Sequence, residues 1–252
     1  ETQSDDLSIK NENAIRRDKL GSIEFKSTSY RYPEAEIDTL KQINLKIEEG
    51  EKVAILGRNG SGKSTLMKLA SGLFKASDGL VMYDGVDIKQ IHSQDISRSI
   101  GIVLQDVQLF SGSVRENITM GRENISEEDL LQAGILSGLD EFISKIPGGY
   151  DLVLADGGKG LSGGQRQAIA LARAIVHKPS HFILDEPTSA MDMNSESLFI
   201  NQVKEILQGS TMLVVTHRMP LLNLVDRVIV MHEGNIVEDG PKEEILKKLN
   251  PS

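Results

Sequence analysis

Apolar residues gather into short runs along the chain, and their spacing predicts its strands. Runs 22–26 and 44–48 alternate apolar with polar positions, as half-buried strands do, and they could pair as an antiparallel edge. Runs 182–184 and 212–215 are apolar throughout, which is typical of a parallel sheet covered on both faces. The same pattern predicts strands at 52–56, 79–83 and 99–104, and a C-terminal hairpin that joins 228–231 to 236–237.

Helix signals stand between these strands. Ser126 precedes three acidic residues and predicts the start of a helix that runs to Ser137, just before Gly138. Further helices are expected over 66–71, over the alanine-rich 169–176, and over 242–249 after Pro241. The elements together indicate an α/β fold.

Composition narrows the classes of protein. The 252 residues suit one large α/β domain or two closely packed lobes, and an apolar content of 39% is enough for a sizeable core. A net charge of −9 argues against nucleic acid as a partner. The chain has no cysteine, so disulfides and thiolate metal sites are excluded. No apolar run approaches the ~18 residues that a membrane-spanning helix needs.

The first residues have a different character. Residues 1–19 are polar, charged and without period, and we expect them to be a linker or tail. Because the first residue is Glu1 rather than Met, we expect the chain to be a piece of a longer protein.

The phosphate loop, residues 57–65, carries the clearest chemistry. It lies between a predicted strand and a predicted helix and has the spacing G-x-x-x-x-G-K-S. Glycines let backbone N–H groups turn toward phosphate oxygens, and the helix N-terminus adds partial positive charge. Lys63 can neutralise terminal phosphates, and the Ser64 hydroxyl can ligate Mg²⁺. The expected nucleotide-binding residues are Gly57, Arg58, Asn59, Gly60, Ser61, Gly62, Lys63, Ser64 and Thr65.

Two adjacent carboxylates end the apolar run 182–184. Asp185 and Glu186 stand where the strands of an α/β sheet bind ligands, and their side chains point to opposite sides of the strand. We expect Asp185 to hold Mg²⁺ and Glu186 to orient or deprotonate an attacking water.

A second glycine motif, Leu161-Ser162-Gly163-Gly164-Gln165, precedes a helix, and we call it the signature segment. Ser162 with Gln165 fits a capping box, which is a purely structural reading. Two glycines at a helix start are costly, however, unless another group must approach the backbone closely. A second anion site at this helix N-terminus would explain them.

Together these motifs resemble the nucleotide-binding domain of ATP-binding cassette (ABC) transporters, whose LSGGQ signature stands intact at 161–165. The resemblance covers about 20–250. It implies a P-loop NTPase (RecA-like) core with an antiparallel β edge subdomain and an inserted α-helical signature subdomain. The domain would span 20–252, with the core at about 20–105 and 178–252 and the helical subdomain at about 106–177.

The resemblance also assigns roles to single residues. Tyr32 would stack on adenine, with Tyr30 as its rival, and Gln105 would reach Mg²⁺. His217 would contact the γ-phosphate, so that the catalytic set is Glu186, His217, Lys63 and Gln105 and the metal set is Ser64, Gln105 and Asp185. The implied ligands are ATP and Mg²⁺.

Pairing of two copies is part of the family pattern. The site of one copy would be completed in trans by the other copy's Ser162, Gly163, Gly164, Gln165 and Asp192. Asp192 belongs to a loop, 189–192, that crosses to the second subunit in the family, although it also suits a helix cap. This homodimer would bind ATP at its interface and no nucleic acid.

The type of transporter is indicated by two stretches. Residues 105–118 resemble exporters, and 156–167 look most like bacterial type I secretion and bacteriocin exporters, although many exporters have a glutamate where this chain has Gly158. Such proteins fuse an N-terminal transmembrane domain to a soluble ATPase domain at the cytoplasmic face of the cell membrane. An importer ATPase, or a non-transport ABC ATPase of DNA repair or translation, is the alternative.

Overall fold

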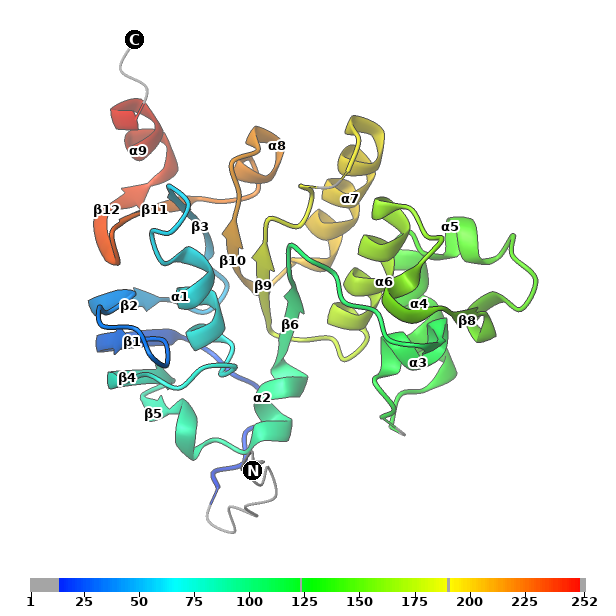
Figure 1. Cartoon of the computed structure of the whole chain (residues 1–252), viewed down its shortest axis with the longest axis horizontal. Coiled ribbons are helices and arrows are strands. Elements are labelled where there is room, and N and C mark those ends of the chain that lie inside the picture. The colour runs from blue at the N-terminus through cyan, green and yellow to red at the C-terminus, as the bar shows by residue number, and fades with distance from the viewer. Residues whose placement is uncertain (1–13, 123, 190, 250–252) are drawn as a thin grey trace.

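A mostly parallel sheet forms the centre of the computed structural model, which describes residues 14–122, 124–189 and 191–249 (Figure 1). Its six strands lie in the order β12-β11-β3-β10-β9-β6. Neighbours from β11 to β6 are parallel, and only β12 runs antiparallel to β11. The strands are β3 (Lys52–Gly57), β6 (Ile100–Val103), β9 (His181–Asp185), β10 (Thr211–Val215), β11 (Arg227–His232) and β12 (Asn235–Pro241). The predicted α/β core is confirmed.

A second sheet, antiparallel, has the order β2-β1-β4-β5. Its strands are β1 (Ile23–Tyr30), β2 (Leu40–Ile47), β4 (Asp78–Tyr83) and β5 (Val86–Asp87). Ile23 pairs with Ile47 and Phe25 with Leu45, so the two alternating runs of the sequence do form an antiparallel edge. Both strands are longer than the runs that predicted them.

Buried residues of the parallel strands face two separate cores. Val53 and Ile55 of β3 pack with α1 (Lys63–Ala70) and the antiparallel sheet. Ala54 and Leu56, which alternate with them, pack with α6 (Gly163–Ile175) and α7 (Met193–Ile206) on the other face. A strand covered on both faces gains nothing from polar positions, which explains its unbroken apolar sequence.

The segment between β6 and β9 builds a mainly helical region, which lies to the right of the parallel sheet in Figure 1. It contains β7 (Gly112–Ser113), α3 (Val114–Thr119), α4 (Glu127–Leu136), α5 (Asp140–Ile143), β8 (Val153–Leu154) and α6. Ser126 caps α4 by accepting a hydrogen bond from the Asp129 N–H at 3.1 Å, as the sequence predicts. The remaining helices are α2 (Ser93–Ser99), α8 (Met219–Leu222) and α9 (Lys242–Leu249).

The described part of the predicted tail lies against the core. Ile15 bridges Ile91, and the Arg16 guanidinium pairs with the carboxylate of Asp95, which is nearly fully buried. That contact, more than any other, holds the pKa of Asp95 below its usual range. Residues 14–19 therefore have fixed packing partners, which their polar composition did not predict; the rest of the expected linker, 1–13, lies outside the described residues.

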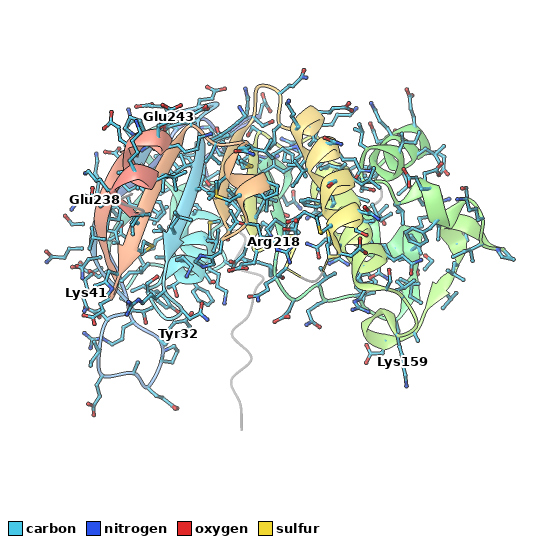
Figure 2. All side chains as sticks on the ribbon, turned by 90° about the horizontal axis from the view of Figure 1, so that it is seen from above. Tyr32, Lys41, Lys159, Arg218, Glu238 and Glu243 are labelled. Atoms are coloured by element: carbon cyan, nitrogen blue, oxygen red, sulfur yellow. The ribbon has the colours of Figure 1, made fainter. Side chains whose placement is uncertain are left out.

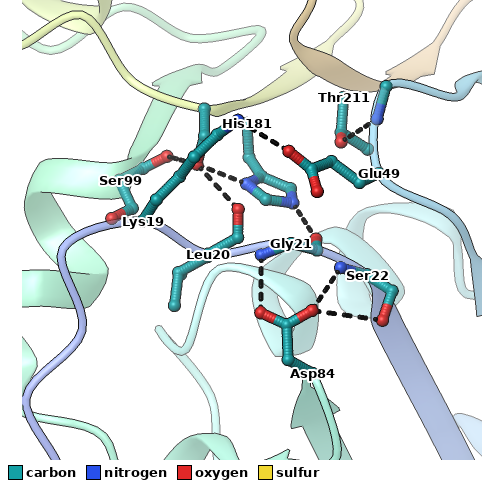
Figure 3. A network of polar contacts seen from close by, with 11 residues as sticks. Lys19, Leu20, Gly21, Ser22, Glu49, Asp84, Ser99, His181 and Thr211 are labelled. Carbon is teal, nitrogen blue, oxygen red and sulfur yellow. Dashed lines mark hydrogen bonds and ion pairs between the residues drawn. The ribbon is translucent and has the colours of Figure 1, made fainter.

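Residues 19–22 are tied to the beginning of β9 by a polar network around His181 (Figure 3). The Gly21 carbonyl lies 2.6 Å from His181 Nε2, and Ser180 Oγ lies 2.9 Å from His181 Nδ1. Asp84 accepts from the Gly21 N–H at 3.0 Å, and burial lowers the pKa of His181.

Among the described residues, no helix has the length and apolarity needed to cross a membrane.

Candidate functional site

The phosphate loop joins β3 to α1, and two of its glycines lie where a side chain would be strained and would clash. Gly57 and Gly62 have φ values of 150° and 103°. A Cβ on Gly57 would lie 2.4 Å from the Met231 carbonyl oxygen, and one on Gly62 would lie 2.6 Å from a Leu40 methyl. The Gly234 N–H donates to the Ser61 carbonyl at 3.1 Å and braces the loop. The helix begins at Lys63, three residues earlier than predicted, and within the described chain no side chain caps it. Its N-terminus is thus open to an anion.

Lys63 lies across this loop. Its Nζ donates to the Gly57 carbonyl at 2.8 Å and to the Arg58 carbonyl at 3.0 Å. Burial lowers the pKa of Lys63, while the charges of Glu186 and Asp185 act in the opposite direction. The ammonium group is therefore held at the mouth of the loop, within the field of the two carboxylates.

The predicted acidic pair and histidine come together at the ends of β9 and β10. Asp185 is buried and pairs in register with Val215, beyond which lies His217. Glu186 Oε1 lies 3.7 Å from His217 Nε2, so the carboxylate and the imidazole face each other. Glu186 has a φ of 47°, and its N–H donates to the Val215 carbonyl at 2.9 Å. A left-handed backbone at a non-glycine residue is often found at functional sites.

The tyrosines near the loop differ in exposure. Tyr30 is buried at 8% relative exposure and stacks on Phe74 with ring centroids 5.0 Å apart. Tyr32 is 37% exposed, meets Tyr30 edge-on, and its hydroxyl lies 3.1 Å from Thr65 Oγ1. A cavity of about 790 Å³ lies beside it, lined among others by Arg31 and Lys41. Tyr32 is the more exposed of the two rings and therefore the more accessible to a ligand.

The expected metal ligands have oxygen atoms of the kind that Mg²⁺ prefers. Ser64 is exposed at the start of α1, Asp185 ends β9, and Gln105 is exposed just beyond β6. A hydroxyl, a carboxylate and an amide oxygen form a hard donor set that fits Mg²⁺. In the part of the chain that the structure describes, no hydrogen bond or ion pair joins these three side chains to one another. Among the described residues there is also no cluster of three or more acidic, histidine or cysteine side chains that could hold a metal ion.

The signature segment stands apart from the phosphate loop of the same chain. Strands β10, β9 and β6 lie between α1 and α6 in Figure 1. Ser162 Oγ accepts from the Gln165 N–H at 3.2 Å and Gln165 Oε1 accepts from the Ser162 N–H at 2.9 Å, so the capping box is present. A Cβ on Gly164 would sit 3.5 Å from Ser195 Oγ, an ordinary contact. The fold itself therefore does not require glycine at this position.

Asp192, expected to act in trans, caps α7. Its carboxylate accepts from the N–H groups of Asn194 and Ser195, both at 3.0 Å, and the bonds with Ser195 are the main reason why its pKa is lowered. Residue 190 of the same loop lies outside the described residues. The capping role and a role at an interface are compatible, because the side chain is exposed.

Gly158 departs from the exporter pattern for a local reason. Its φ is 66°, it is buried, and a Cβ there would come within 2.7 Å of a Leu109 methyl. A glutamate at this position would meet both strain and a clash, which explains why this chain has glycine there.

Sequence reasoning missed Arg173, which holds the segment after Gln105. Its guanidinium donates to the Asn117 carbonyl at 2.7 Å and the Gln108 carbonyl at 3.0 Å, and it lies 6.0 Å from the centre of the Phe110 ring. Burial lowers the pKa of Arg173. An arginine within an alanine-rich helix gives no hint of these partners, since they lie far away in the sequence.

Replacing Arg173 by lysine is expected to lower the free energy of unfolding by about 2 kcal/mol, because Nε and Nη1 bind carbonyls of two different segments and lysine has one nitrogen in place of these two. Urea unfolding followed by circular dichroism measures the change. Lys248, whose ion pair with Glu238 is exposed, provides the control: Lys248→Gln should change stability by less than about 0.5 kcal/mol. Equal effects of the two substitutions would contradict the buried role of Arg173.

The chain is similar in sequence to known proteins. The family model described as ABC transporter matches residues 40–189. The chain is 43% identical over 226 residues to the cyclolysin secretion/processing ATP-binding protein CyaB of Bordetella pertussis, covering 90% of this chain and 32% of that protein. It is 42% identical over 230 residues to the leukotoxin translocation ATP-binding protein LktB of Mannheimia glucosida, covering 91% of this chain and 32% of that protein.

The chain is also similar to a solved structure. The chain superposes on a bacterial Atm1-family ABC exporter with ATP bound, with a TM-score of 0.84 and 28% sequence identity. The match covers 92% of this chain and 40% of the exporter chain. The chain thus spans about a third of the length of the curated relatives that it matches.

Proposed function

This chain belongs to the ABC transporter family, and we propose that it is the ATP-hydrolysing domain of an exporter that moves a protein or peptide. The observation that carries the proposal is the phosphate loop with Lys63 lying across it. The charge of Glu186, which faces His217, acts on the Lys63 ammonium. Similarity to secretion and translocation proteins favours export over the importer and non-transport alternatives. We place the domain boundaries, the core and the helical subdomain where the sequence predicts them.

Nucleotide binding follows from the loop geometry. The ring of Tyr32 stacks on the adenine, and the N–H groups of the phosphate loop receive the β- and γ-phosphates. Lys63 leaves the Gly57 and Arg58 carbonyls and donates to phosphate oxygens, which form stronger, charge-assisted bonds. Ser64, Gln105 and Asp185 would hold Mg²⁺, which supplies positive charge against the phosphate oxygens when bound.

The hydrolytic step uses the residues at the strand ends. Glu186 accepts a proton from a water molecule while the water oxygen attacks the γ-phosphorus. The bond between the γ-phosphorus and the oxygen that bridges it to the β-phosphate breaks. His217 donates a hydrogen bond to the γ-phosphate, and Lys63 offsets the negative charge that develops on the leaving oxygen. The 3.7 Å separation of Glu186 and His217 leaves both groups free to turn toward a ligand.

We propose that two copies complete each site. In Figure 2, Tyr32 and Lys159, which lies just before the signature segment, are found toward the lower side of the molecule, and Arg218 lies between them, nearer the middle. A face-to-face homodimer brings Ser162, Gly163, Gly164, Gln165 and Asp192 of one copy to the phosphates held by the other. The room at Gly164 suits such an approach. A transmembrane domain, N-terminal in the full-length protein, would place the dimer at the cytoplasmic face of the cell membrane.

Phosphate release by the purified chain tests the proposed activity directly. With ATP and Mg²⁺ we expect steady turnover that a chelator of divalent cations removes. If the folded chain released no phosphate above background at any protein concentration, the proposed activity would be wrong.

Tyr32→Ala is expected to raise the KM for ATP about tenfold and to change kcat less than about threefold, since aromatic stacking contributes on the order of 1–3 kcal/mol and holds the base rather than the phosphates. Tyr32→Phe serves as the control, because it keeps the ring and removes only the contact with Thr65. Steady-state kinetics separates the two parameters. If alanine and phenylalanine raised KM equally, Tyr32 would not stack on the base.

A further inference from the structure

Arg218 follows His217 directly and makes contacts that the proposed reaction does not use. Its guanidinium Nη1 donates to Glu196 Oε2 at 3.0 Å, and Nη2 lies 3.3 Å from the Ser189 carbonyl oxygen, to which it donates. Its own N–H donates to Thr216 Oγ1 at 3.0 Å, which fixes the turn that leaves β10. One side chain thus joins the end of β10 to the 189–192 loop and to α7.

Glu196 is the charged partner, and it lies inside the protein. Its relative exposure is only 7%, and its second carboxylate oxygen accepts from the Thr188 hydroxyl at 2.7 Å. A buried carboxylate is tolerated only when it is paired and hydrogen-bonded. Glu196 lies on the first turn of α7, and its place there therefore fixes where the Arg218 guanidinium must lie.

These contacts close a ring that contains the proposed base. The Ser189 N–H donates to the Glu186 carbonyl at 3.1 Å, while the Ser189 carbonyl accepts from Arg218. Arg218 is bonded to His217, whose imidazole lies 3.7 Å from the Glu186 carboxylate. Glu186 thus has its backbone held from one side and its side chain faced from the other. Because its φ of 47° is unfavourable, surrounding contacts must keep it there.

We propose that Arg218 is a positioning residue that, through the Ser189 carbonyl, holds Glu186 where it can accept the proton of the attacking water. This inference rests on the proposed ATP hydrolysis and adds to it a residue that touches neither nucleotide nor water. Glu196 holds the guanidinium in place, and the guanidinium in turn holds Ser189, which is bonded to the Glu186 carbonyl.

Arg218→Lys separates this role from a structural one. A lysine still pairs with Glu196, so the melting temperature should stay within about 2 °C of the wild-type value. Arg218 uses Nη1 for Glu196 and Nη2 for the Ser189 carbonyl, and lysine has one nitrogen in place of these two. With that nitrogen held at Glu196 the bond to Ser189 is lost, so kcat should fall about tenfold or more while the KM for ATP stays within about twofold. Adding Glu196→Gln should leave the kcat of Arg218→Lys unchanged, because the loss arises at Ser189.

Arg227→Lys is the matched control. The Arg227 guanidinium binds Glu51, Asp239 and the Lys46 carbonyl at the other end of the parallel strands, away from the phosphate loop. This substitution should lower the melting temperature by about 4 °C or more and leave kcat within about twofold.

The outcomes are distinct. A kcat within twofold of wild type for Arg218→Lys, or parallel losses of stability and turnover as in a general structural defect, would overturn the positioning role while wild-type hydrolysis still supports the proposed function. A wild-type chain without ATP hydrolysis would overturn both.

Discussion

Replacing Glu186 by glutamine is expected to lower ATP turnover by a factor of about 10² to 10⁴, while ATP still binds. Glutamine has the size of glutamate but cannot accept the proton of the attacking water. The phosphate loop and Tyr32 remain unchanged, so affinity for the nucleotide should be retained. The neutral side chain also removes a negative charge that faces the γ-phosphate, and the ATP-bound dimer should accumulate.

Single-turnover phosphate release and ATP affinity measure the two effects of Glu186→Gln separately. Glu233→Gln is the matched control, because Glu233 has a φ of 46° and also lies beside a histidine, His232 at 3.9 Å, yet it is 78% exposed on a hairpin turn. It should retain turnover within about twofold. Wild-type turnover in Glu186→Gln would show that another group accepts the proton.

Lys63→Ala is expected to weaken ATP binding by a factor of about 10 to 100 and to remove measurable turnover, since charge-assisted hydrogen bonds contribute on the order of 1.5–3 kcal/mol. The Lys63 ammonium already lies at the mouth of the phosphate loop, on the Gly57 and Arg58 carbonyls. Exchange of these neutral acceptors for phosphate oxygens is the source of the gain. Arginine at this position should not restore binding, because Lys63 is buried and a planar guanidinium is bulkier than an ammonium.

Fluorescent-nucleotide titration and phosphate release test the role of Lys63. Lys52 stands at the other end of β3 and its Nζ donates to the Gly50 carbonyl at 3.3 Å, so Lys52→Ala removes a lysine–carbonyl contact from the same strand. It should leave affinity and turnover within about twofold. If Lys63→Ala bound and hydrolysed ATP like Lys52→Ala, the phosphate loop would not be the nucleotide site.

Much of the fold could be predicted because its signals are local. Apolar runs located β3, β9 and β10, and Ser126 located the start of α4. The phosphate loop was visible because glycine spacing, a lysine and the flanking elements lie in one short stretch. Asp185 and Glu186 were found because strand ends place side chains at one edge of a parallel sheet, and His217 was found through the resemblance to ABC transporters.

What the sequence did not predict depends on contacts between distant segments. The helix α7, which Asp192 caps, was not predicted, and α2 and α3 are too short to show a period. Arg173 and Arg218 look like ordinary surface arginines until the fold brings carbonyl groups to them. Residues 14–19 were expected to be a polar tail because of their composition. The Arg16–Asp95 pair could not be foreseen, because it joins segments that lie far apart along the chain.

The central claim is that ATP lies between the phosphate loop of one copy and the signature segment of another. The most direct measurement is the rate of phosphate release per molecule, followed across a hundredfold range of protein concentration with saturating ATP and Mg²⁺. The account predicts that this specific rate rises with concentration and then levels off as the dimer fills. A specific rate that stays constant down to concentrations at which sedimentation finds only monomer would contradict it.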